Sequence, residues 1–120
     1  MSNKILIVED DSDFQDIYQL YLQGESFQVL TAMNGKEAMA VLEKETPDLI
    51  ILDLIMPVMD GEEFYLWLRS QEKWQRIPVI VASVNEKIPL RMIELGGMAG
   101  SLKKPFEIDV LVEMIRANLK

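Results

Sequence analysis

Two hydrophobic periodicities alternate along these 120 residues, and this alternation limits the possible folds more than any other feature. Short continuous apolar runs, such as ILIV at 5–8 and VIVAS at 79–83, are typical of buried strands. Between such runs, apolar residues recur at i, i+3 and i+4, as on one face of a helix. The predicted strands are 5–8, 27–32, 48–54, 79–83 and 100–103.

Each predicted strand is followed by a helical segment with its own apolar stripe. We expect Asp11 or Ser12 to cap the first helix and Gly24 to end it. Pro89 fits the first turn of the fourth helix. The apolar residues at helical spacing in the first helix are Phe14, Ile17, Tyr18, Tyr21 and Leu22. The second helix is expected to bury Ala38, Val41 and Leu42, and the last to bury Ile108, Leu111, Val112, Ile115 and Leu119. The third helix contains Phe64, Trp67 and Leu68, and the fourth contains Met92 and Leu95.

Strict alternation of five strands and five helices predicts an α/β fold with right-handed crossovers and a parallel sheet covered on both faces. The first, third and fourth strands are apolar throughout and should be central, whereas the mixed second and fifth should be edges. The order 2-1-3-4-5 of a doubly wound, flavodoxin-like sheet satisfies this. We expect residues 1–120 to form a single domain whose ligand crevice lies beyond the carboxyl ends of the strands.

Composition excludes several classes of function. The sequence has no cysteine and no histidine, which removes thiolate metal sites and nucleophiles that depend on a histidine base. Its formal net charge of −8 argues against direct binding to nucleic acid or to anionic lipid. No apolar stretch approaches the ~20 residues of a membrane span, and the acidic N-terminus does not resemble a signal peptide. A cytoplasmic protein is expected.

Charged and polar side chains follow the predicted strands at their carboxyl ends. They are Glu9, Asp10 and Asp11 after the first strand, Asp53 near the end of the third, Ser83 at the end of the fourth, and Lys103 and Lys104 after the fifth. Clustered carboxylates repel one another unless a cation joins them. Mg²⁺ prefers oxygen ligands and accepts one or two carboxylates plus a phosphate. One carboxylate could then attack phosphorus, with the ion and a lysine offsetting charge on the transferred oxygens.

Four stretches at these intervals resemble the receiver domain of two-component response regulators. They are ILIVEDD, LDLIMPVMDG, VIVAS and KKPF, and the likeness extends over residues 3–119. The resemblance implies that Asp53 is the phosphoacceptor, that Lys104 contacts the phosphoryl group, and that Ser83 is the switch hydroxyl. It further implies that the protein is not an enzyme in the ordinary sense, although it would assist its own phosphorylation and dephosphorylation.

The same resemblance implies a Mg²⁺ site. Asp10 and Asp11 correspond to the acid pair of the family, with Asp11 as the more direct support of the ion and Glu9 in an indirect role. Asp53 and the backbone carbonyl of Ile55 would complete the ligands. The implied partners are a sensor histidine kinase or histidine phosphotransfer protein and a downstream effector protein or output domain.

Two positions depart from the family pattern. Ser101 stands where an aromatic residue usually swings inward on activation, and Val84 stands where alanine is common. The sequence therefore leaves open a phosphorylation-independent docking module. An aspartate-dependent phosphatase and a flavin-binding protein fit less well. Such phosphatases carry an acid where this chain has Ile55, and EDDSD after the first strand would repel the phosphate of a flavin.

Overall fold

A computed structural model, which describes residues 3–84 and 87–119, contains a five-stranded parallel sheet. The strands are β1 (Lys4–Val8), β2 (Gln28–Ala32), β3 (Leu49–Leu52), β4 (Val79–Ser83) and β5 (Met98–Lys103). Their order, β2-β1-β3-β4-β5, confirms the predicted topology. β1, β3 and β4 are central and β2 and β5 are edges, as the difference in apolar character indicated.

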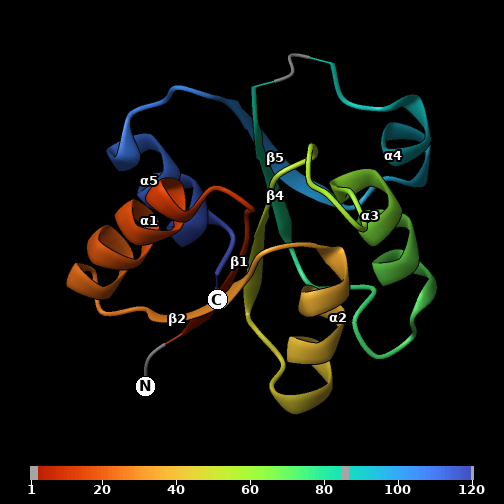
Figure 1. Cartoon of the computed structure of the whole chain (residues 1–120), viewed down its shortest axis with the longest axis horizontal. Coiled ribbons are helices and arrows are strands. Elements are labelled where there is room, and N and C mark those ends of the chain that lie inside the picture. The colour runs from red at the N-terminus through yellow and green to blue at the C-terminus, as the bar shows by residue number, and fades with distance from the viewer. Residues whose placement is uncertain (1–2, 85–86, 120) are drawn as a thin grey trace.

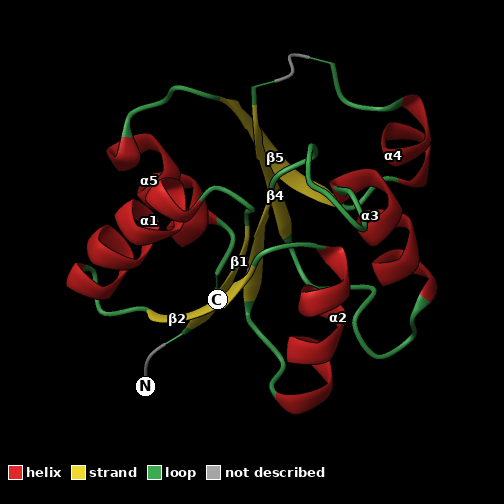
Figure 2. Cartoon of the chain, in the orientation of Figure 1, coloured by secondary structure: helices red, strands yellow, loops and turns green. Residues whose placement is uncertain are grey.

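Helices cover both faces of the sheet (Figure 1, Figure 2). The helices are α1 (Ser12–Gly24), α2 (Gly35–Lys44), α3 (Gly61–Ser70), α4 (Leu90–Leu95) and α5 (Ile108–Ala117). α1 and α5 lie on one face, and α2, α3 and α4 lie on the other (Figure 1). Each face has its own hydrophobic core, and no described helix has the length and apolar character needed to cross a membrane.

Two strand boundaries differ from the prediction by two residues, and the starts of β1, β2 and β3 differ by one. β3 ends at Leu52 rather than at residue 54, which leaves Asp53 just beyond the sheet. β5 begins at Met98, two residues earlier than expected. The turn before it is made by Gly96 and Gly97, whose φ angles of 73° and 83° suit glycine and allow the chain to re-enter the sheet at once.

The apolar stripe of α1 is wider than the face that this helix buries. Tyr18 and Leu22 are buried, but Ile17 and Tyr21 are about half exposed, at 46% and 50%. Ile17 and Tyr21 share the helical spacing of the buried residues but lie at the margin of the stripe, partly in solvent. Helical spacing alone cannot show this, because a sheet and one neighbouring helix cover only part of such a stripe.

Candidate functional site

The register of the sheet brings two of the predicted acids side by side. Val8 of β1 pairs with Leu52 of β3, and each strand then continues into a carboxylate residue, Glu9 or Asp53. The Asp53 amide donates to the Val8 carbonyl at 3.0 Å, which fixes the two ends at the same level. The carboxyl ends of parallel strands thus place these side chains together.

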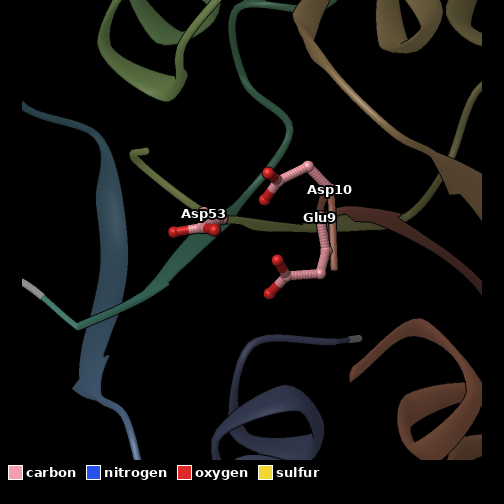
Figure 3. Close-up of side chains that lie close together, drawn as sticks. All are labelled: Glu9, Asp10 and Asp53. Atoms are coloured by element: carbon pink, nitrogen blue, oxygen red, sulfur yellow. The ribbon is translucent and has the colours of Figure 1, made fainter. Parts of the chain in front are cut away.

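Glu9, Asp10 and Asp53 form one acidic cluster, hereafter the acid cluster. One carboxylate oxygen of each lies within 4.8 Å of those of the other two, and the three groups gather at one place (Figure 3). Glu9 and Asp53 are buried, whereas Asp10 is exposed. The cluster borders a surface cavity of about 290 Å³ lined by Glu9, Asp10, Asp11, Phe14, Asp53, Ile55, Val84 and Lys104.

Lys104 provides the cation of this site. Its ammonium group donates to Glu9 Oε1 and lies 3.6 Å from Asp53 Oδ2. The same group stands 4.3 Å from the centre of the Phe14 ring, in a cation–π contact. With 7% of its surface exposed, Lys104 is a buried cation held between two carboxylates and an aromatic face. A surface role for this lysine is therefore excluded.

Glu9 and Asp11 differ from the expected arrangement. Glu9, for which only an indirect role was predicted, lies in the acid cluster. Asp11 lines the cavity, but its Oδ1 accepts hydrogen bonds from the amides of Asp13 and Phe14 at 2.9 and 3.3 Å and caps α1. The Asp11 carboxylate is thus committed to a helix end, and the geometry favours Glu9 and Asp10 over Asp11 around an ion.

Gln15 is a structural residue of the site that sequence reasoning missed. Its buried Nε2 lies 3.0–3.2 Å from the carbonyl oxygens of Ile7, Glu9 and Ala32. These contacts fix the backbone where β1 passes into the acidic segment. The only available signal was an amide at a position of α1 that faces the sheet, one turn before the buried Tyr18.

The remaining predicted residues lie around the same end of the sheet. Ser83 is buried at the end of β4, and its carbonyl accepts from the Lys104 amide at 2.8 Å. The Ile55 amide lies 3.4 Å from Asp53 Oδ1. Val84 and Ser101 are exposed, the first beside the cavity and the second on β5. The chemical roles of Ser83 and Ile55 stay predictions.

Burial perturbs the charge of Glu9. Desolvation raises the pKa of the Glu9 carboxyl to about 7, from an ordinary 4.5. The hydrogen bonds from Lys104 and from the Asp11 amide oppose this rise, whereas the negative charge of Asp53 adds to it. Glu9 therefore holds its proton at pH values where an exposed glutamate has lost it.

This raised pKa predicts a pH-dependent stability. Below pH 4.5 Glu9 is protonated in both the folded and the unfolded state; between 4.5 and about 7 only the folded state keeps the proton. The stabilisation from this proton is complete at the acidic end and is lost as the pH rises through 7. In urea unfolding with EDTA, we expect the free energy of unfolding of the wild type, relative to Glu9→Gln, to fall across this window. A difference that stayed flat would contradict the assignment.

The acid cluster fits a divalent cation. Lys104 is paired with two of its three carboxylates, Glu9 and Asp53, so that full ionisation would give these four groups together a charge of −2. The ligand atoms are all oxygens and lie close enough to share one ion. Glu9, Asp10 and Asp53 are the side chains that would hold Mg²⁺ here, directly or through its waters.

Comparison with known proteins agrees with this geometry. Residues 5–116 match the sequence pattern described as the response regulator receiver domain. The chain belongs to this family. Receiver domains are phosphoproteins of two-component signalling, and binding of Mg²⁺ in their acidic pocket is typical of the family. The resemblance drawn from the four motifs is confirmed.

Individual relatives show how far the similarity extends. The alkaline phosphatase synthesis transcriptional regulatory protein PhoP of Bacillus subtilis is 35% identical over 120 residues, which are 100% of this chain and 50% of that protein. The chain spans about half the length of the first curated relatives that it matches. Chemotaxis protein CheY4 of Vibrio cholerae has a TM-score of 0.88 and 32% identity, covering 99% of this chain and 100% of that one.

A further neighbour bears on the metal. The receiver domain of sensor histidine kinase PA1611 from Pseudomonas aeruginosa, solved with a magnesium ion coordinated in its active site cleft, has a TM-score of 0.84. It is 27% identical to this chain, and the match covers 98% of each.

Proposed function

We propose that this receiver domain, as a single unit over residues 1–120, accepts a phosphoryl group on Asp53 from a phosphohistidine of a sensor kinase or phosphotransfer protein. The observation that carries the proposal is the convergence of Glu9, Asp10 and Asp53 within 4.8 Å of one another, with Lys104 3.6 Å from the Asp53 carboxylate. Direct binding of nucleic acid or membrane forms no part of it, because the chain is acidic.

The chemistry follows from the charges at the site. An Asp53 oxygen attacks phosphorus, the new O–P bond forms as the P–N bond to the donor imidazole breaks, and the imidazole leaves with the bonding electrons. Mg²⁺, when bound, would neutralise charge on the phosphoryl oxygens. Lys104 would supply a second positive charge beside Asp53, and the Ser83 hydroxyl is the proposed hydrogen-bond donor to the product.

Glu9, Asp10 and Asp53 are the proposed side-chain ligands of the ion. Asp11, given the more direct role from the sequence, is proposed as a lesser contributor because its carboxylate caps α1. The backbone carbonyl of Ile55 remains a proposed ligand; the amide of the same residue lies 3.4 Å from Asp53 Oδ1. Phosphorylated Asp53 would then change the affinity of the cytoplasmic protein for an effector protein or an output domain.

The test is the formation of an acyl phosphate. We expect incubation with acetyl phosphate and Mg²⁺ to add one phosphoryl group to the intact protein, as measured by mass spectrometry. The adduct should be lost in Asp53→Asn and on addition of EDTA, because the first removes the nucleophile and the second the cation.

Asp60→Asn is the matched control. Asp60 lies seven residues further along and caps α3 through its side chain, a role that asparagine can also fill. The Asp60 variant should therefore keep the adduct. If no donor modified the wild type, the phosphorylation-independent docking module would be favoured; the exposed Ser101, which replaces the family's aromatic residue, is the feature consistent with it.

A further inference from the structure

Tyr18 of α1 carries a buried hydroxyl that has no hydrogen-bond partner among the residues that the structure describes. Only 2% of the surface of this residue is exposed. A buried donor that gives up water without gaining an acceptor costs free energy, so such groups are rare in native proteins. A residue that keeps one is a candidate for a role in a second state of the molecule.

The other two tyrosines show the usual arrangements. Tyr65 is also fully buried, but its hydroxyl donates to the carbonyl of Gly96 at 2.6 Å. Tyr21 is about half exposed, so that its side chain lies partly in solvent. In the part of the chain that the structure describes, Tyr18 is thus the one tyrosine whose hydroxyl is both buried and unpaired.

Aromatic packing fixes Tyr18 beside the acid cluster. Its ring stacks on those of Phe14 and Phe106, with ring centres 6.1 and 6.3 Å away. Phe14 in turn carries the Lys104 ammonium 4.3 Å from its ring centre, and this ammonium donates to Glu9. Tyr18 therefore lies one aromatic ring away from the cation of the site, and close packing limits where its hydroxyl can go.

The negative charge of the acid cluster also acts on Tyr18. Burial is the main cause that raises the pKa of the Tyr18 phenol, and the charges of Glu9 and Asp53 raise it further. The phenol therefore stays neutral and keeps its proton as a hydrogen-bond donor. A neutral donor suits a carboxylate partner because it adds no positive charge that would compete with Mg²⁺.

Phosphorylation would remove the donor that Glu9 has at rest. Lys104 donates to Glu9 Oε1 in this structure, and the proposed function moves that ammonium onto the phosphoryl oxygens of Asp53. Glu9 is 2% exposed, so water has little access to replace the lost hydrogen bond. The site would then hold a buried acceptor without a donor, near a buried donor without an acceptor.

We propose that Tyr18 is a positioning residue of the phosphoacceptor site, whose hydroxyl is unpaired at rest and donates to Glu9 once Lys104 turns to the phosphoryl group. The new hydrogen bond holds the Glu9 carboxylate in place beside the ion. The change of donor on phosphorylation rests on the proposed function. The pairing of Tyr18 with Glu9 whenever Lys104 is missing does not.

The first experiment measures urea midpoints in EDTA and needs no phosphorylation. Tyr18→Phe keeps the stacked ring and removes only the hydroxyl, so it should raise the midpoint in the wild-type background, where that hydroxyl is unpaired. In Lys104→Met, Glu9 has already lost its donor and Tyr18 should pair with it, so the same substitution should lower the midpoint. Tyr65→Phe, which loses the bond to Gly96, should lower the midpoint in both backgrounds. An effect of Tyr18→Phe with the same sign in both backgrounds would overturn the proposal.

The second experiment uses beryllium fluoride with Mg²⁺, which together imitate the phosphoryl group, and reads the bound fraction from fluorine resonances. We expect Tyr18→Phe to weaken uptake by about fivefold, the worth of one hydrogen bond, and Tyr21→Phe to leave it unchanged. In wild type the hydroxyl proton of Tyr18 should shift downfield on uptake, which a tyrosine with a purely structural role would not show. An unchanged affinity of Tyr18→Phe, or a hydroxyl signal that does not shift, would contradict the change of donor.

The two experiments separate this proposal from the proposed function. Failure of the wild type to take up beryllium fluoride would count against the proposed function and the change of donor together. The reversal of sign in the Lys104→Met background would still decide whether Tyr18 pairs with Glu9. If Lys104→Met did not fold, the affinity of Tyr18→Phe and the hydroxyl signal of the wild type would decide the proposal.

Discussion

Gly61→Ala is expected to destabilise the protein by about 3 kcal/mol or more and to disturb Asp53, the proposed phosphoacceptor. A methyl group at Gly61 would lie 2.2 Å from the Asp53 carbonyl oxygen and 2.7 Å from Leu54 Cα. Both are backbone atoms, and the Gly61 amide is tied to the Leu54 carbonyl at 3.0 Å, so neither side can move away without breaking the loop.

Two other glycines show whether backbone contact is the cause. At Gly35 the three atoms nearest to the added carbon, at 2.6–3.0 Å, all belong to the flexible side chain of Met59, and we expect a loss of about 1 kcal/mol. At Gly24, the last residue of α1, the added carbon would meet no heavy atom within 4 Å outside its chain neighbours and the adjacent helix backbone, and alanine should stabilise the helix by up to about 1 kcal/mol.

Urea unfolding of the three alanine variants measures their free energies of unfolding and so tests the expected order of stability. Phosphorylation by acetyl phosphate, measured well below the unfolding transition, then reports on the site. Gly61→Ala should accept phosphate more slowly because its clash falls on Asp53, the proposed nucleophile, whereas Gly24→Ala should behave as the wild type. A stable Gly61→Ala protein with an unchanged rate would mean that the loop after β3 is not held as closely as these contacts indicate.

The sheet and the position of Asp53 could be predicted because both follow from the ends of apolar runs. Four consecutive apolar residues, Leu49–Leu52, define a buried strand, and the next residue must leave it at the carboxyl end. Parallel pairing then brings Glu9 to the same level through the Val8–Leu52 register. These properties follow from local pattern and from the small number of topologies that right-handed crossovers permit.

The different structural roles of three successive acidic residues could not be predicted in the same way. Glu9, Asp10 and Asp11 differ in role because β1 ends at Val8 and α1 begins at Ser12, and a shift of one residue in either boundary would exchange their directions. The burial of Glu9 also depends on Lys104, which is 95 residues away in the chain. Likewise, the exposure of Ile17 depends on how closely α5 packs beside α1.

Lys104→Met is expected to have opposite effects on metal binding and on phosphoryl transfer. Methionine keeps much of the length of the side chain but leaves Glu9 and Asp53, which are 2% and 7% exposed, without their cation. In EDTA the free energy of unfolding should fall by about 3 kcal/mol, because a buried pair loses one partner. Mg²⁺ should then bind more tightly than in the wild type, since one competing positive charge is gone, and should restore part of the stability.

Phosphoryl transfer should nevertheless become slower, by about a hundredfold, because the positive charge that Lys104 would offer to the phosphoryl oxygens is missing. Unfolding measured along a Mg²⁺ titration reports on metal binding, and the rate of adduct formation at saturating Mg²⁺ reports on phosphoryl transfer. Lys36→Met, at an exposed lysine of α2, is the control and should change neither metal binding nor the transfer rate. If Lys104 only held the carboxylates apart, saturating Mg²⁺ would restore the rate along with the stability. A variant that regains its stability in Mg²⁺ but stays slow would instead place the ammonium of Lys104 on the phosphoryl group during transfer.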